Sequence, residues 1–148
     1  MKKDVVLFAI PLMEIKWPAP AIYHLKGQLE ASGTITCAAV DSNILLYNSF
    51  KEEWNDIVYM LHWHTYDPMQ ELYDKVINCL KNTFDEYIIK HDPEWIGISI
   101  FSLNSRRVGV DIIKYVRYMW PDKKILIGGA GLGDALGDTS FEFAKDLL

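Results

Sequence analysis

A run of glycines close to the end of the chain offers the clearest chemistry in the sequence. Four of the seven residues at positions 128–134 are glycine, and the positions that could touch a ligand are Gly128, Gly129, Ala130 and Gly131. Glycine permits a positive φ and close backbone approach, so exposed N–H groups there could hold a phosphate or an amide. A tight turn without any ligand is the alternative. The run is neither a nicotinamide fingerprint, which follows a first strand, nor a P-loop, which needs Gly-Lys-Ser/Thr.

Four small polar side chains form a second candidate group about thirty residues earlier. They are Ser99, Ser102, Asn104 and Ser105. Ser99 lies within an apolar, strand-like run, and the other three follow its end, where they could bond the polar tail of a ligand. Capping of the next helix by Asn104 and Ser105 explains the same residues equally well.

The pair His62 and His64 is the only motif with a hint of metal binding. No Cys, Asp or Glu stands beside it at the spacing of a metal site, so histidines at a surface or interface, with Trp63 packing between them, are the favoured interpretation. The sequence shows no arrangement of nucleophile and base, and it therefore predicts no catalytic residue in this chain.

Composition excludes several classes of protein. Half of the 148 residues are hydrophobic, which supports a packed core and argues against disorder. The net charge is −5 and the only basic cluster is Arg106-Arg107, so a basic face for nucleic acid is not expected. No segment has the length of a membrane span. Cys37 and Cys79 lie outside any C-x-x-C motif and predict reduced, buried thiols in a cytoplasmic protein.

Apolar runs alternate with helical patterns along the whole chain. Runs rich in Val and Ile predict four strands, and apolar residues at helical spacing predict five helices. The strands are expected at 4–10, 34–40, 95–101 and 124–127, and the helices at 20–32, 50–61, 69–91, 105–119 and from Thr139 onward. Asp41-Ser42-Asn43 has the composition of a turn, and Asp67 is expected to be the N-cap of the long helix.

This alternation predicts one α/β domain over residues 1–148. Parallel strands joined by right-handed crossovers give a doubly wound, Rossmann-like sheet of four to five strands with flanking helices. In the flavodoxin-like order, the strand order reverses between the first and third strands, and ligands bind there beyond the carboxyl ends. The loops 11–20, 102–106 and 128–134 would meet at that edge. We expect a fifth strand beyond Leu148, so that the chain would be truncated.

The ordered series of motifs resembles the N-terminal cobalamin-binding domain of cobalamin-dependent radical S-adenosylmethionine enzymes. The likeness spans nearly the whole chain, although no single piece of it is diagnostic. It is carried by the opening strand, loop and helix from Val5 to Gly33, by the turn at Asp41 and Asn43, by the strand from Pro93 to Ser99, by Ser105, by Trp120 to Ile125, and by Ile127 to Gly131.

The resemblance implies that cobalamin lies over the sheet edge, with its nucleotide tail beside the loops of the third and fourth strands. Pro11, Leu12 and Met13 stand where related proteins carry a cobalt-binding histidine. The resemblance thus implies a cobalt without a histidine ligand, with Leu12 or Met13 near its lower face. The iron–sulfur cluster and S-adenosylmethionine would belong to a downstream domain, because the chain contains no C-x-x-x-C-x-x-C motif.

Two other functions remain open. A domain of this fold could bind a partner without any cofactor, and the aromatic-rich segment from Trp54 to Tyr66 would suit such contacts, including a homo-oligomer. The same loops could also hold another nucleotide-like ligand, such as a flavin.

Overall fold

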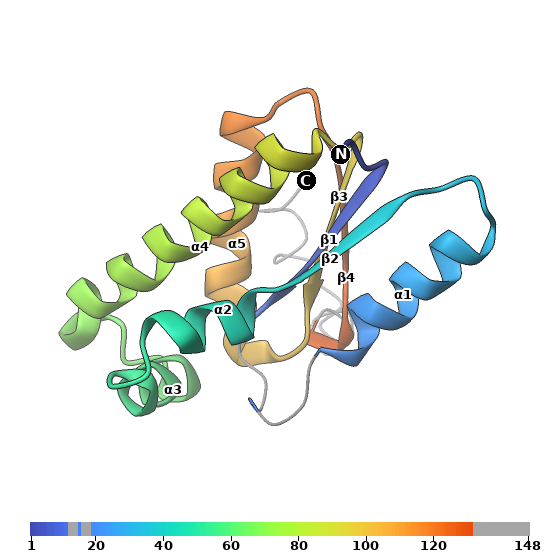
Figure 1. The fold of residues 1–148 in the computed structure, drawn as a ribbon. Coiled ribbons are helices and arrows are strands. Elements are labelled where there is room, and N and C mark those ends of the chain that lie inside the picture. The colour runs from blue at the N-terminus through green and yellow to red at the C-terminus, as the bar shows by residue number, and fades with distance from the viewer. Residues whose placement is uncertain (12–14, 16–18, 132–148) are drawn as a thin grey trace, which may run out of the picture.

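The computed structural model describes residues 1–11, 15 and 19–131 (Figure 1). Strands and helices alternate as the sequence predicts. The strands are β1 (Val5–Ile10), β2 (Cys37–Asp41), β3 (Trp95–Ile100) and β4 (Lys124–Gly128). The helices are α1 (Pro20–Ala31), α2 (Ser42–Ser49), α3 (Trp54–Trp63), α4 (Gln70–His91) and α5 (Arg106–Met119), with short 3-10 turns η1 (Asp67–Met69) and η2 (Leu103–Ser105). The helix expected from Thr139 lies outside the described residues.

The four strands form one parallel sheet in the order β2-β1-β3-β4. The order reverses between β1 and β3, so the predicted α/β fold with a flavodoxin-like arrangement is confirmed. Figure 1 shows α1 on one side of the sheet and α2, α4 and α5 on the other. This arrangement brings the carboxyl ends of all four strands to one edge.

Two local predictions in the middle of the chain are wrong. The residues after β2 form no free turn, because α2 starts at Ser42 and the side chain of Asp41 caps it. Asp67 does not cap the long helix either. It lies in η1, and α4 begins three residues later at Gln70. In both places a short polar side chain suited more than one local structure.

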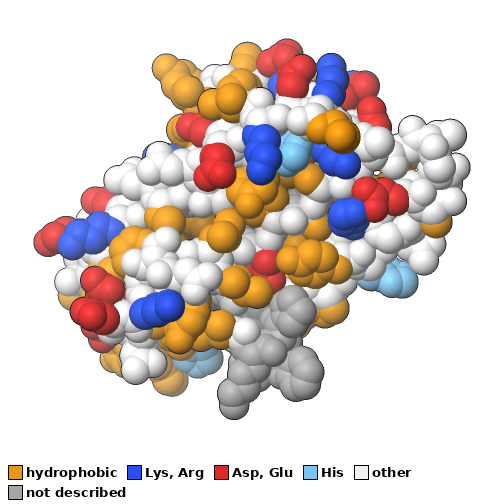
Figure 2. All heavy atoms as spheres, viewed as in Figure 1, with side chains coloured by type: hydrophobic (Ala, Val, Ile, Leu, Met, Phe, Trp, Pro, Cys, Tyr) orange, Lys and Arg blue, Asp and Glu red, His pale blue; other side chains and the backbone are white. Residues whose placement is uncertain are grey.

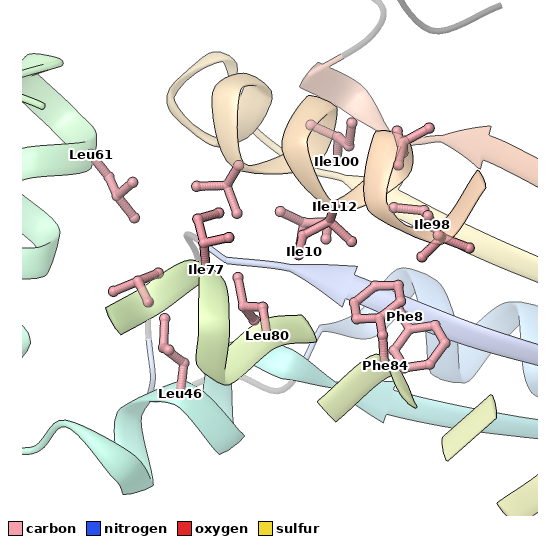
Figure 3. Packing of buried hydrophobic residues seen from close by; sticks show 14 of the residues in the cluster. Phe8, Ile10, Leu46, Leu61, Ile77, Leu80, Phe84, Ile98, Ile100 and Ile112 are labelled. Carbon is pink, nitrogen blue, oxygen red and sulfur yellow. The ribbon is translucent and has the colours of Figure 1, made fainter. Parts of the chain in front are cut away.

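The main core fills the space between the sheet and α2, α4 and α5 (Figure 3). Phe8 of β1 stacks on Phe84 of α4, with ring centroids 3.8 Å apart. Ile98 and Ile100 of β3 lie near Ile112 of α5 in the same layer. These fully buried side chains fix α4 and α5 against the sheet, and α5 in turn fixes the loop that precedes it.

Among the described residues, the opposite face of the sheet is covered by a helix over β1 and β2 only. A smaller core of Leu7, Ala9, Ile22 and Cys37 packs α1 over β1 and β2. No other helix of the described residues packs there, and Leu126 of β4 remains 62% exposed.

The surface gives two further facts. On the face drawn in Figure 2, basic and acidic side chains are interspersed and form no broad basic area. Within the described residues, no helix combines the length and apolar character needed to cross a bilayer.

Candidate functional site

A row of residues without large apolar side chains crosses the sheet near its carboxyl edge. Strand register aligns Ala9 with Asp41 on one side and with Ser99 on the other, and aligns Ser99 with Gly128. Ala9 belongs to the core beneath α1, and side chains alternate between faces, so the row faces the α1 side. At about 4.8 Å per strand the row is about 14 Å wide. Ala9 and Asp41 are buried, so only Ser99 and Gly128 of this row are open to a ligand.

The half of this row on β3 and β4 opens into an apolar crevice between α1 and the sheet. The crevice consists of two adjoining hollows of about 210 and 280 Å³ that share Leu7, Leu25, Gly97 and Leu126. The hollow nearer the carboxyl edge is also lined by Ala21, Ile22, Ile98, Ser99, Ile127, Gly128 and Gly129. Among the described residues that line the two hollows, Ser99 is the only one with a hydroxyl side chain. The crevice could take a flat apolar group and offer it one hydrogen bond.

The glycines of the loop after β4 have two different roles. A Cβ on Gly129 would lie closer than 3.0 Å to backbone atoms of Ile100, and one on Gly131 would lie 2.7 Å from the carbonyl oxygen of Ser102. These two glycines are therefore required for packing of the loop against the end of β3. A Cβ on Gly128 would meet nothing within 4 Å, because that position faces the open crevice. Gly128 is thus the glycine whose small size leaves room for a ligand.

The loop after β3 is braced by its own polar side chains. Ser102 Oγ and Ser105 Oγ lie 3.0 Å apart, and Ser105 is fully buried. Although Ser105 is the N-cap residue of α5, its side chain makes no capping hydrogen bond. The Arg106 guanidinium donates two hydrogen bonds of 3.3 Å to the carbonyl oxygen of Gly131. The structure therefore brings the predicted serine and glycine loops together.

Both carboxylate oxygens of Asp41 accept hydrogen bonds from backbone N–H groups of the protein. One carboxylate oxygen accepts the N–H groups of Asn43 and Ile44 at 3.1 and 3.2 Å, and the other accepts the N–H of Ala19 at 2.8 Å. Asp41 and Asn43 are both buried. The carboxylate of Asp41 ties the start of α1 to the end of β2, beside the crevice and outside its lining.

The remaining predicted site residues divide into two groups. Pro11 is buried directly after β1, and Ala130 is exposed in the turn after β4. Neither lines the crevice. Leu12 and Met13 lie outside the described residues, as do Gly133 and Asp134 of the glycine run.

The two central histidines have separate partners. His62 Nδ1 lies 3.1 Å from the side-chain nitrogen of Asn104, while His64 Nδ1 lies 3.2 Å from the hydroxyl of Tyr66. No group of three or more His, Cys, Asp or Glu side chains suited to a metal ion occurs among the described residues. The contact between His62 and Asn104 joins α3 to the loop after β3, at the edge where the candidate ligand loops meet.

Sequence reasoning missed several residues of the crevice. Gly97 makes room on the α1 face of the sheet, while Ala21 and Leu25 form the wall on α1. Gly97 could have been predicted from the sequence. It is a small residue two positions before Ser99 in the same strand, so both residues face the same side of the sheet. The wall could not be inferred, since it depends on which strands α1 covers.

Cys37 lies in the small core under α1 and yields a pH prediction. Burial, with a further contribution from Glu30, raises the pKa of its thiol from 9.0 to about 11. The unfolded chain therefore releases this proton first, so the free energy of unfolding should fall as pH rises from 9 to 11. Urea titrations across this range test this, with Cys37→Ala as the control that should lose this part of the pH dependence. An identical pH slope in both proteins would contradict the prediction.

Comparisons of the chain with protein-family models, curated proteins and solved structures give no match. The case for a function therefore depends on the sheet edge, the crevice and the two loops described above.

Proposed function

We propose that this chain binds cobalamin and acts as the cobalamin-holding part of a radical S-adenosylmethionine enzyme. The observation that carries the proposal is the apolar crevice between α1 and strands β3 and β4, with Ser99 and Gly128 at its carboxyl end. A crevice of this kind suits the flat aromatic base at the end of the cobalamin tail. The radical chemistry would belong to a downstream domain with its own iron–sulfur cluster and S-adenosylmethionine.

The residues that line the crevice suit the base of the cobalamin tail in size and polarity. Leu7, Leu25 and Leu126 offer apolar contact on both sides of a flat ring, and Gly128 leaves open space beside them. The Ser99 hydroxyl could bond a ring nitrogen or a tail oxygen, because it is the one such group among the described lining residues. The polar part of the tail would then leave the crevice at the edge formed by the two braced loops.

Bound cobalamin would supply a reactive cobalt–carbon bond for methyl transfer or rearrangement. The chain would contribute binding and orientation, with the crevice holding the tail and the sheet edge supporting the ring. The proposal includes a cobalt without a histidine ligand, because the loop 11–20 contains no histidine.

A binding experiment with a matched pair of variants tests the proposal. The chain is incubated with hydroxocobalamin, separated from free ligand by gel filtration, and examined by visible spectroscopy. Wild type should retain corrin absorbance, and Gly128→Val should bind at least about tenfold more weakly, because its side chain fills the crevice. Gly27→Val is the control, since a Cβ on Gly27 also meets nothing within 4 Å but lies on the exposed side of α1. Absence of corrin absorbance in wild type would disprove the proposal.

A cofactor-free interaction domain is the second candidate. Tyr59 and Trp63 lie one turn apart on α3 and are 55% and 63% exposed, whereas Trp54 and Tyr66 of the same segment are buried. Exposed aromatic side chains favour contact with a partner. A chain that retains no corrin and elutes as a dimer would favour this candidate. Retention of a yellow, fluorescent ligand would instead indicate a flavin.

A further inference from the structure

A second groove lies on the other side of the molecule, between α4 and α5. Its volume is about 430 Å³, which is within the size range of small-molecule sites. Tyr73 and Ile77 of α4 are buried members of its lining. Its charged members are Asp74, Lys81, Arg107, Asp111 and Lys114, and Gln70, Tyr115 and Tyr118 complete the lining. The groove is thus polar and separate from the apolar crevice.

The two carboxylates of the groove are bonded to neutral donors. Asp111 accepts a hydrogen bond of 2.8 Å from the hydroxyl of Tyr73, and Asp74 accepts one of 2.7 Å from the amide of Gln70. Burial, together with the hydrogen bond to Asp111, raises the pKa of Tyr73, so this hydroxyl remains a donor. Among the ion pairs of the described residues, none joins either carboxylate to a cation of the groove.

Two of the three cations of the groove contact aromatic rings. The Arg107 guanidinium lies 4.2 Å from the ring centroid of Tyr66 and 4.8 Å from that of Tyr73, and Lys81 Nζ lies 5.1 Å from that of Tyr115. Neither these two nor Lys114 forms an ion pair with any described residue. A guanidinium against a ring keeps the N–H groups of its rim directed outward. Three cations without an ion pair to any described residue thus line one groove in a chain whose net charge is −5.

We propose that this groove binds a phosphate-bearing small molecule. Arg107 and Lys114 are seven residues apart on α5, which places them about 10 Å apart along the groove. Phosphate oxygens would accept hydrogen bonds from Lys81 and Lys114, and a second anionic group could reach Arg107. The ring of Tyr118, which is 83% exposed, is available for a planar group. This inference is independent of cobalamin binding, because the two sites share no lining residue.

Calorimetric titration of the whole chain with ATP and with sodium pyrophosphate, both without divalent cations, tests the inference. Wild type should show saturable binding of one ATP, and Lys81→Gln and Lys114→Gln should each weaken it about tenfold, because each removes a charged donor. Lys90→Gln is the matched control. Lys90 also lies on α4 over a tyrosine ring, with Nζ 5.5 Å from the Tyr87 centroid, but outside the groove, so affinity should not change.

The two probes separate the sources of the phosphate. Tighter binding of ATP than of pyrophosphate would support a nucleotide whose base lies on the Tyr118 ring, and equal affinity would support recognition of phosphate alone. The inference is overturned if wild type shows no saturable heat, if adenosine binds as tightly as ATP, or if Lys90→Gln weakens binding as much as the groove variants. Unchanged melting temperatures would show that the variants remain folded.

Discussion

Replacement of Gly129 by alanine is expected to lower the free energy of unfolding by about 3 kcal/mol or more. The residue has φ +114°, and an added Cβ would lie closer than 3.0 Å to backbone atoms of Ile100. Backbone atoms at the end of a central strand cannot move aside cheaply, so both the strain and the clash remain. Urea unfolding followed by circular dichroism measures the change.

The neighbouring glycine provides the control for this experiment. Gly128→Ala should change the free energy of unfolding by less than about 1 kcal/mol, because nothing lies within 4 Å of the added Cβ. Together, these variants distinguish a glycine that packs the loop from one that leaves room in the crevice. Equal stability of Gly129→Ala and Gly128→Ala would show that the loop relaxes around the new methyl group.

Replacement of Asp41 by alanine should cost about 3 kcal/mol. Its carboxylate caps α2, which contributes about 1–2 kcal/mol, and it also accepts the buried N–H of Ala19, which would be left without a partner. Thermal and urea unfolding would give the free energy. The variant should also weaken any ligand binding at the crevice, since the start of α1 would lose its tie to β2.

Ser42→Ala is the matched control for Asp41→Ala. Ser42 is the next residue in the chain, is fully buried, and its Oγ has no hydrogen-bond partner. Removal of this hydroxyl should leave stability unchanged or raise it, because the buried polar atom is unsatisfied. A loss as large as that of Asp41→Ala would mean that the segment is sensitive to any change of volume, and that the carboxylate has no special role.

The sequence predicted the architecture because its strongest signals are local. The β-rich runs of β1 and β3 and the amphipathic pattern of α5 each specify one element, and their alternation specifies a parallel sheet. Boundaries near Asp41 and Asp67 were predicted less well. An aspartate side chain can accept hydrogen bonds from the backbone N–H groups two and three residues later both in a turn and at the start of a helix. The sequence therefore could not distinguish a turn from a helix cap at these positions.

The candidate site was only partly predictable for a different reason. Ser99 and Gly128 follow from their position at strand ends, which sequence pattern can locate. The hydrogen bond between Asp41 and Ala19 joins residues 22 positions apart, so it cannot be predicted from the local sequence pattern. The same is true of the crevice, which exists because α1 covers β1 and β2 but leaves Leu126 exposed.

The central position of β1 affects the order in which the chain can fold. Val5 of β1 is aligned with Cys37 of β2 on one side and with Trp95 of β3 on the other. The hydrogen bonds between β1 and β3 can therefore form only after β3, which comes much later in the chain, has been synthesised. Contacts between residues so distant in sequence form slowly, because a long loop must close first. A nascent chain on the ribosome would therefore hold β1 and β2 as an incomplete, aggregation-prone pair until β3 emerges.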